Sequence, residues 1–252
     1  MLALISPAKS LDFDSEIRAI RSTEARLPDE TERLVSAASN LTKKKLKEIM
    51  PVSDKLVELN YGRYKDFWDQ PERAAIFAFS GDVYIGFEAK SLDDEAIRFA
   101  QDHLRILSGL YGLLRPLDAI RPYRLEMGTK WAPRYKRLTD FWGDKIAGLL
   151  AEDLDADGSG IIVNLASNEY WAAVGDSRTT QAARLITIDF REHGPKGLRF
   201  NSFEAKRARG MMARYICENR IEDPEALKDF DSDDYRFIAK ESDENRWRFI
   251  RR

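Results

Sequence analysis

Apolar and polar positions along this 252-residue chain alternate with two different periods, which predict strands and helices respectively. Short apolar runs rich in β-branched or aromatic residues, bounded by Gly, Pro, Ser or Asn, predict strands at residues 2–5, 74–79, 161–165 and 185–190. Apolar residues at helical spacing predict helices at residues 28–39, 42–50 and 53–68, and a further helix after Ser91. The chain therefore mixes α and β structure.

Two turn sequences indicate antiparallel pairing. The segment 193–197 joins the run 185–190 to residues 198–203, and the segment 242–245 joins residues 235–240 to 246–251. Strands do not alternate strictly with helices, so a mixed α and β (α+β) fold is favoured over a regular doubly wound sheet. No linker-like or low-complexity tract divides the chain, and we expect residues 1–252 to form a single domain.

The stretch from Ser91 to Gly128 contains the most informative pattern. Ser91 and Asp94 have the spacing of a capping box, and a helical apolar pattern follows to Leu107. The next five residues, 108–112, place Gly109 and Gly112 around an apolar and an aromatic residue, and such a turn brings backbone N–H groups close to an anion. This pattern resembles a helix-hairpin-helix, although a glycine cap between two ordinary helices is the alternative.

A basic segment follows this turn. Residues 115–137 hold seven basic side chains against two acidic ones, with Tyr123, Trp131 and Tyr135 between them, as suits phosphate contact with stacking. The whole chain has a formal net charge of -2 and a pI of about 5.9, so the charge must be polarised; residues 222–234 hold seven acids against one lysine. The predicted contacts to duplex DNA are Ser108, Gly109, Tyr111, Gly112, Arg115, Arg121, Tyr123, Arg124, Lys206 and Arg209.

Composition excludes several other classes. No stretch has the length of a membrane span, and the apolar start ends at Ser6-Pro7, so we expect a cytoplasmic protein without a membrane partner. Cys217 is the only cysteine, which excludes an intrachain disulfide, and its place on a predicted helix favours a buried thiol. His103 and His193 are the only histidines, and no metal or cofactor motif occurs, so we predict neither a metal site nor a cofactor.

Polar clusters follow several predicted strands, where loops commonly carry function. Lys9 follows the first strand, Asp82 the second, and Glu169 the third. Together with Glu126 these are the candidate acids, bases or nucleophiles of an enzyme, although each also suits an ordinary turn or cap. Lys206 and Arg209 share one face near the start of a predicted helix, which is either a phosphate contact or a solvated basic face.

These segments resemble the YaaA peroxide stress protein family over nearly the whole chain. The resemblance rests on residues 6–9, 81–84, 107–118, 121–128, 164–167 and 205–210. It implies a bacterial cytosolic protein of unusual mixed fold with a helix-hairpin-helix beside a basic cleft. It also implies DNA binding, protection from hydrogen peroxide and a link to lower unincorporated iron. Glu204 and Arg207 depart from the family pattern, and Glu204 reduces the positive charge there.

The leading hypothesis is therefore a protein of the peroxide response that binds double-stranded DNA with little sequence preference. The alternative is an enzyme acting on a nucleotide, a base or a small phosphorylated substrate. Direct iron sequestration is a third reading, which the scarcity of histidine and cysteine disfavours. The sequence leaves open whether any reaction is catalysed, and which residues would take part.

Overall fold

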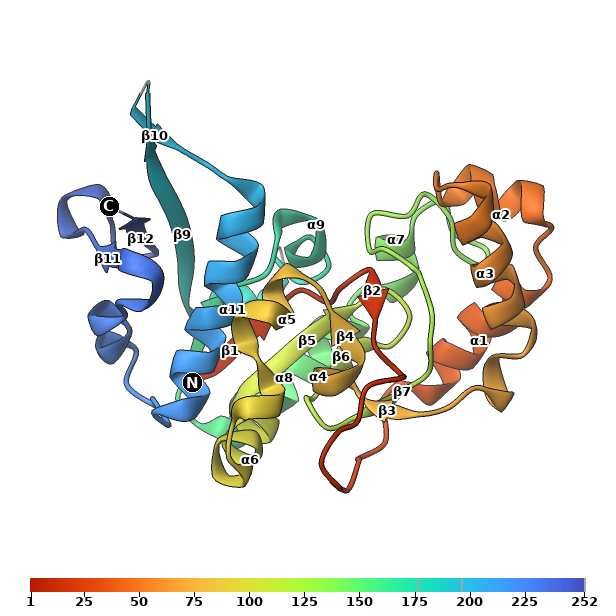
Figure 1. Ribbon diagram of the computed structural model, residues 1–252, viewed down its shortest axis with the longest axis horizontal. Helices are drawn as coiled ribbons and strands as arrows, with labels where there is room; N and C mark the ends of the chain where they lie inside the picture. The colour runs from red at the N-terminus through yellow and green to blue at the C-terminus, as the bar shows by residue number, and fades with distance from the viewer. Residues whose placement is uncertain (176, 196, 252) are drawn as a thin grey trace.

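The structure is a computed structural model that describes residues 1–175, 177–195 and 197–251 (Figure 1). The strands are β1 (Leu2–Ile5), β2 (Ser10–Leu11), β3 (Arg73–Ala74), β4 (Phe79–Ser80), β5 (Leu104–Ser108), β6 (Gly112–Leu114), β7 (Ala119–Ile120), β8 (Ile161–Asn164), β9 (Arg184–Gly194), β10 (Gly197–Arg199), β11 (Tyr235–Phe237) and β12 (Arg246–Arg251). The α-helices are α1 (Pro28–Ser39), α2 (Lys43–Ile49), α3 (Asp54–Lys65), α4 (Ala75–Ala78), α5 (Asp82–Phe87), α6 (Asp94–His103), α7 (Leu138–Trp142), α8 (Lys145–Asp157), α9 (Asn168–Trp171), α10 (Arg178–Ala182) and α11 (Ser202–Glu218). The 3₁₀ turns are η1 (Phe67–Asp69), η2 (Ala89–Ser91), η3 (Pro224–Asp229), η4 (Ser232–Asp234) and η5 (Ala239–Glu241).

The fold mixes α and β structure, as the sequence predicts, and its main sheet contains both parallel and antiparallel pairs. Its strand order is β11-β12-β9-β8-β1-β5-β6, and β10 pairs with β9 beside this path. The strands from β12 to β5 run parallel to their neighbours, whereas β6 and β11 are antiparallel at the two edges. Both predicted hairpins are confirmed by the antiparallel pairs β9 with β10 and β11 with β12. Lys196, in the first predicted turn, lies outside the described residues.

The apolar run of β1 is continuous because the strand is buried on both faces. Each of its four residues is fully inaccessible to solvent, which is typical of a central parallel strand. Helix α11 packs against β1 and β9 and crosses α5, while α8 contacts β6 and α10 contacts β9. In Figure 1, α11 and α5 lie in front of the sheet.

Two glycines make the crossing of α5 and α11 possible. A side chain at Gly86 would overlap the carbonyl oxygen of Arg207, and one at Gly210 would overlap that of Val83. Only hydrogen fits between the two backbones at these points. Gly86 and Gly210 therefore serve helix packing, and they allow α5 to lie directly against α11.

Helices α1, α2 and α3 form the right-hand end of the molecule in Figure 1. They enclose a second small core made of Ala38, Leu46, Met50, Val57 and Tyr64. The side chain of Thr42 caps α2, accepting from the N–H of Lys45. Trp131 packs on this core, so the chain beyond Gly128 is fastened to the three helices.

Two predicted elements differ from the structure. The run 74–79 is not a strand: its centre is the single turn α4, because the N–H groups of Ala75 and Ile76 donate to the carbonyls of Asp118 and Pro116. The helix predicted after Ser91 begins at Asp94, capped by Asp93, and ends at His103. The following residues pair with β1 as the parallel strand β5. Leu104 and Leu107 have helical spacing, but both lie in this strand.

The helix-hairpin-helix interpretation of residues 108–112 is corrected by the same pairing. These residues join β5 to β6 in a tight antiparallel turn, with Ser108 paired to Gly112. Ser108 Oγ accepts from the N–H of Tyr111 at 3.0 Å, and the carbonyl of Gly109 accepts from Trp142 Nε1 at 3.0 Å. A left-handed glycine, Gly112 with φ +72°, closes the turn. The glycines thus support a strand connection rather than a helix connection.

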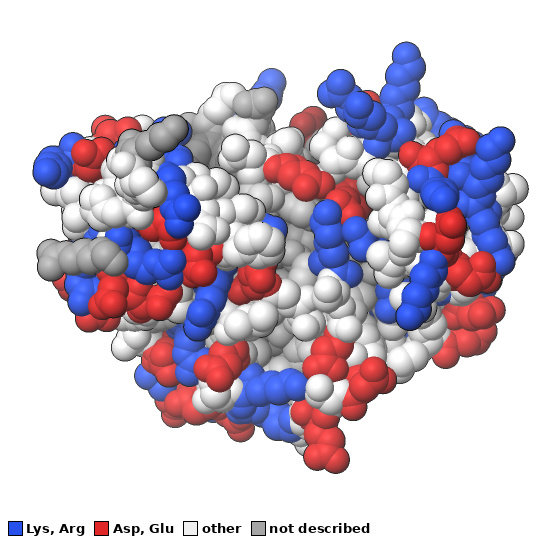
Figure 2. Space-filling model, turned by 45° about the horizontal axis from the view of Figure 1, so that its top comes forward, with Lys and Arg blue, Asp and Glu red and all other residues white. Residues whose placement is uncertain are grey.

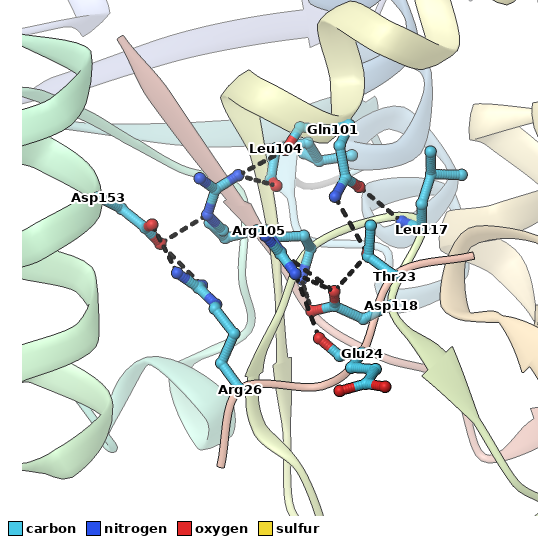
Figure 3. A network of polar contacts seen from close by, with 10 residues as sticks. Thr23, Glu24, Arg26, Gln101, Leu104, Arg105, Leu117, Asp118 and Asp153 are labelled. Carbon is cyan, nitrogen blue, oxygen red and sulfur yellow. Dashed lines mark hydrogen bonds and ion pairs between the residues drawn. The ribbon is translucent and has the colours of Figure 1, made fainter. Parts of the chain in front are cut away.

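A buried polar network fastens the N-terminal segment to the sheet and to α8 (Figure 3). Asp153 accepts from Arg26 at 2.6 and 2.9 Å and from Arg105 Nε at 2.6 Å. Burial raises the pKa of Asp153, but hydrogen bonds from the two arginines outweigh it and hold the pKa below its usual value. Asp118, which is fully buried, accepts from Thr23 and Arg115. The charged side chains of this network therefore pair with one another inside the protein.

Candidate functional site

The order of the strands creates a topological switch point between β1 and β8, and we call the region beyond the carboxyl ends of these two strands the crevice. From β1 the chain passes to β5 and β6 on one side, and it then returns to place β8 on the other side of β1. Since β1 and β8 are parallel, their carboxyl ends lie at the same edge, where connections depart in opposite directions. Such a switch point is the usual ligand position in open α/β sheets. Ser6 follows β1 there, and Ser167 follows β8.

The two serines hold the strand ends together. Ser6 Oγ accepts from the N–H of Ser167 at 2.9 Å and donates to Ser167 Oγ at 3.3 Å. The hydroxyl of Tyr84, on α5, donates to the carbonyl of Ser6 at 3.2 Å. Ser6 is nearly inaccessible and Ser167 is half-buried. The crevice therefore has a fixed polar floor contributed by three separate segments.

Glu126, at the crevice, pairs with two cations. Lys9 Nζ lies 2.7 Å from Glu126 Oε2, and Arg124 Nη2 lies 2.9 Å from Glu126 Oε1. Partial burial raises the pKa of Glu126, but the two cations outweigh that effect and the net pKa lies below its usual value. Glu126 is therefore an ionised group held at a defined position. The Lys9 side chain is 58% exposed, so it lacks the desolvation that a nucleophilic lysine requires.

Glu169 completes the acidic side of the crevice. Its Oε1 accepts from the N–H of Gly128 at 3.1 Å, and a side chain at Gly128 would press against this carboxylate. The glycine thus allows Glu169 to reach the backbone. Tyr170 follows on α9, and the charges of Glu169 and Glu126 both reach its hydroxyl. Both carboxylates therefore act on the same small region.

Three buried phenols lie beneath this region. Burial raises the pKa of Tyr84, Tyr123 and Tyr170. The charge of Tyr170 would add to this effect at Tyr84 and Tyr123, and the charges of Glu169 and Glu126 add to it at Tyr170. They are neutral at physiological pH and serve as hydroxyl donors or acceptors. Tyr123 also shares a 2.7 Å hydrogen bond with Ser108 Oγ. A polar ligand in the crevice would meet hydroxyls below and charges at the rim.

Three of the four predicted acid, base or nucleophile candidates therefore lie together. Lys9 and Glu126 are in contact, and Glu169 is joined to Gly128, two residues further along the same segment. Asp82 begins α5, directly after Gly81, which packs against Ala8. The arrangement can orient a polar ligand and accept or donate protons at its rim.

Comparison with known proteins identifies the family. A family model described as "Peroxide stress protein YaaA" matches residues 1–241. The chain belongs to the YaaA peroxide stress protein family. It is 60% identical over 252 residues to a UPF0246 protein of Rhizorhabdus wittichii, with 100% of this chain and 99% of that protein covered. UPF0246 proteins of Alteromonas mediterranea and Teredinibacter turnerae are 46% and 44% identical, covering 100% of this chain and 98% and 100% of those proteins.

The segments that resemble the YaaA family converge on the crevice. Residues 6–9, 81–84, 121–128 and 164–167 each supply a group to it or a direct neighbour of such a group. The segment 205–210 supports the site from outside, through the crossing of α11 with α5. The remaining segment, 107–118, instead contains the end of β5, the turn at 108–112 and β6.

Five of the predicted DNA contacts lie in the core of this family member. Ser108, Gly109, Tyr111 and Gly112 are buried, and so is Tyr123. The carbonyl of Gly109 accepts from Trp142, and Ser108 Oγ bonds to the N–H of Tyr111 and to the hydroxyl of Tyr123. Within the same turn, the carbonyl of Leu110 accepts from Thr31. The turn therefore presents no open backbone to a phosphate, because it packs under α7 and α1 as part of the sheet.

The three predicted arginines are accessible only in part, and each has an internal partner. Arg115 pairs with Asp118 at 2.8 Å, Arg121 with Glu72 at 2.8 Å, and Arg124 with Glu126 at 2.9 Å. Between 15% and 28% of each side chain is exposed. The positive charge of these arginines is therefore largely neutralised by the neighbouring carboxylates.

Lys206 and Arg209 do not form one phosphate-binding face. Lys206 is exposed and lies over the ring of Phe203 at 5.8 Å. Arg209 is turned inward, and its Nε is buried without a hydrogen-bond partner. Burial lowers the pKa of Arg209; neighbouring Asp189 opposes this effect, whereas Arg191 adds to it.

Four other cations of the basic segment are free. Lys130, Arg134, Lys136 and Arg137 are exposed, and no ion pair or side-chain hydrogen bond engages them within the residues that the structure describes. They follow Gly128 directly and lie on the segment that Trp131 fastens to the small core of α1–α3. They belong to the basic run seen in the sequence, but nothing in that run distinguishes them from the paired arginines.

The surface charge is distributed accordingly. Figure 2 shows Lys and Arg side chains standing out over the right-hand half of this face, and acidic next to basic side chains at its centre. The acidic segment 222–234 forms η3 and η4 beside the edge strand β11, at the opposite end of the sheet from β6. The acidic segment 222–234 and the four free cations of the basic segment are thus separated along the molecule.

Two remaining expectations concern membranes and metals. Among the described residues, no helix is long and apolar enough to cross a membrane. The same residues contain no group of three or more His, Cys, Asp or Glu side chains arranged to hold a metal ion. Cys217 is fully buried on α11 as predicted, and burial raises the pKa of its thiol.

Proposed function

We propose that this protein binds duplex DNA with little sequence preference as its part in the hydrogen peroxide response. The observation that supports this most directly is the group of free cations Lys130, Arg134, Lys136 and Arg137, which we name the free basic segment. Unpaired, exposed cations on one short stretch are the groups that exchange counterions for phosphates. In this proposal the four cations contact the phosphate backbone, which positions a protein on the duplex and carries no direct sequence information.

The backbone conformation of the segment supports the same role. Ala132 and Tyr135 exchange hydrogen bonds of 3.1 and 3.3 Å across a turn, with Pro133 and Arg134 at its corners. Arg134 has φ +66°, a region that favours glycine. An arginine held there costs stability, and the strain is explained if the exposed guanidinium is needed at the tip of the turn.

The link of the family to unincorporated iron follows, in this proposal, from DNA engagement. The chain contains two histidines, far apart in sequence, and one cysteine, which is buried. A tight iron site with soft ligands would need more of these groups together. We therefore expect cells carrying a variant without the free basic segment to lose peroxide resistance, while anaerobic ferrous titration of the purified protein stays unchanged.

Salt-dependent titration tests the DNA proposal. The test variant replaces Lys130, Arg134, Lys136 and Arg137 with glutamine. The control variant removes four paired cations at the other end, by the same change at Arg184, Arg220, Lys228 and Arg236. We expect the test variant to lose about 0.9 units of salt slope for each lost phosphate contact and the control to resemble the parent. Equal losses in both variants, or a flat salt response of the parent, would exclude the model.

A second candidate function is an enzyme acting on a nucleotide, a base or a small phosphorylated substrate. It is favoured by the meeting of Lys9, Glu126 and Glu169 with the serines at the switch point. The test is product formation from DNA and nucleotides by the parent, compared with Glu126→Gln and Glu169→Gln. Turnover that survives both substitutions, with the folds intact, would remove the crevice as the catalytic site.

A further inference from the structure

Two large aromatic side chains are exposed where β10 leads into α11. Phe200 is 49% exposed and Phe203, in the first turn of α11, is 70% exposed. Leu198, on β10, is 39% exposed. Exposed phenylalanine surface gathered on one short stretch indicates a contact site, because isolated folding would favour its burial.

The position of this stretch is set by the unusual length of β9. Strand β8 is paired with β9 only from Arg184 to Thr187. From there β9 continues to Gly194, a further seven residues or about 23 Å at the usual rise of a strand. Since β8 and β9 are parallel, β9 projects beyond the same edge as the crevice. Figure 1 shows this projection, with the start of α11 beside it.

Both rings already carry a cation. The guanidinium of Arg191 lies 5.3 Å from the centre of the Phe200 ring, and Lys206 Nζ lies 5.8 Å from the centre of the Phe203 ring. Cations at these distances are attracted by the ring faces. We name the two phenylalanines with Arg191 and Lys206 the aromatic platform.

The acids near the platform have cationic partners on other segments, and Arg251 is shared among Glu192, Glu204 and Asp233. Glu192 lies 2.7 Å from Arg251 and 2.6 Å from Arg199, and Glu204 lies 2.8 Å from Arg251. Glu204, which departs from the family pattern, is thus occupied by the C-terminal strand. Lys206 and Arg207 are exposed, with no ion pair within the described parts of the chain. Arg191 of the platform pairs with Asp189 at 2.9 Å, so Lys206 and Arg207 are the unpaired cations that this surface presents beside the aromatic faces.

We propose that the aromatic platform stacks unpaired bases of a DNA strand that continues from the duplex bound at the free basic segment. Aromatic faces interleaved with cations are the recurring means of holding single strands, because every base has a face and every nucleotide a phosphate. The charge favours this occupant over an apolar protein surface. The proposal rests on the proposed duplex binding, and it adds a preference for DNA with an unpaired strand.

The experiment compares a blunt duplex with the same duplex carrying a six-thymine overhang at either end. Variant Phe200→Leu, Phe203→Leu keeps apolar surface but removes the aromatic faces. The matched control is Leu59→Ala, at another exposed apolar position. We expect the parent to bind one overhang substrate roughly 5- to 100-fold more tightly than the blunt duplex. In the leucine variant this ratio should fall to about one, with blunt-duplex affinity unchanged.

Separate outcomes distinguish the two proposals. A parent that binds no duplex at all contradicts the proposed function, whereas a ratio of one in a parent that does bind duplex contradicts only the platform. A leucine variant that keeps the parent's ratio also overturns the platform. Phe203→Trp offers a check independent of that variant, since a larger face should raise the ratio. Binding of the parent and the leucine variant to anionic vesicles, without an overhang preference, would assign the surface to a membrane instead.

Discussion

The arginines at 115, 121 and 124 and the free basic segment at 130–137 belong to one basic run, but the structure uses them differently. Each arginine of the first part meets a carboxylate within 2.9 Å. The cations of the second part meet none among the residues described. The difference shows that the positive charge of a segment does not measure the charge available to a ligand.

The cause of the difference lies in what each part packs against. The first part passes between the sheet and the N-terminal segment, where a charge without a partner would be costly. Asp118 is fully buried beneath Arg115, and Glu126 supports Arg124 from two positions away. The second part lies outside the small core of α1–α3, with Trp131 inward and its cations outward. The partly buried cations of the run are therefore paired, and the exposed cations are free.

The largest expected effect comes from breaking an internal pair. Arg115→Met would leave the buried carboxylate of Asp118 without its cation, since Arg115 donates from Nε and Nη2 at 3.0 and 2.8 Å. We expect the free energy of unfolding to fall by about 3–5 kcal/mol. Urea denaturation of this variant and of Arg137→Met measures the contrast. Equal stability of the two variants would break the distinction between paired and free cations.

A second prediction sharpens the position of the turn at 108–112. Gly112 has φ +72°, and a side chain there would meet Leu27 at 2.8 Å and Trp142 at 2.9 Å. Gly112→Val therefore combines backbone strain with overpacking, and we expect the free energy of unfolding to fall by about 2–4 kcal/mol.

Gly62→Ala is the control for this substitution. Gly62 lies within α3 and has open space around it, so alanine should stabilise the protein by roughly 0.5–1 kcal/mol. Thermal unfolding followed by circular dichroism compares the two variants. A folded Gly112→Val protein of parental stability would mean that the turn is not packed in the core.

A smaller effect of opposite sign is expected at the tip of the free basic segment. Arg134→Gly relieves the positive φ of a non-glycine residue, so the free energy of unfolding should rise by up to about 1 kcal/mol. DNA affinity should fall at the same time, with a salt slope lower by about 0.9. Denaturation and titration of one preparation measure both quantities. Parental affinity would show that this guanidinium makes no phosphate contact.

Much of the secondary structure was predictable because the local pattern of apolar residues matched the faces that are buried in the fold. Helix α1 has the predicted bounds, and β1 and the last hairpin lie where their apolar patterns place them. The secondary-structure prediction was wrong where the spacing of apolar residues fitted both a helix and a strand. Leu104 and Leu107 fit a helix face, but the parallel partner β1 decides for a strand. The residues around Leu104 and Leu107 do not indicate that this segment pairs with β1, which lies about 100 positions earlier in the sequence.

The site was predictable in its members but not in its arrangement. Lys9 and Glu169 were found because polar residues follow strands, and parallel strands bring such residues to one edge. The roles of Gly86 and Gly210 in helix crossing and of Ser6 in joining the strand ends depend on contacts between distant segments. For the same reason, the sequence could not separate paired from free cations.

The smallest expected effect concerns Glu126, which stands between the two parts of the basic run. Its pKa in the folded protein lies below the usual 4.5, because Lys9 and Arg124 outweigh the effect of partial burial. A lowered carboxyl pKa stabilises the fold above the unfolded-state value, and this stabilisation is lost as pH falls through the folded-state value. The parent should therefore exceed Glu126→Gln in stability near pH 6, and the difference should shrink as the pH is lowered from about 4.5 toward 3. Urea midpoints at several pH values measure it, with Glu16→Gln, at an exposed position, correcting for the general loss of one negative charge. A difference that stays constant from pH 6 to pH 3 would show that Lys9 and Arg124 do not hold this carboxylate, and the crevice would lose its fixed acid.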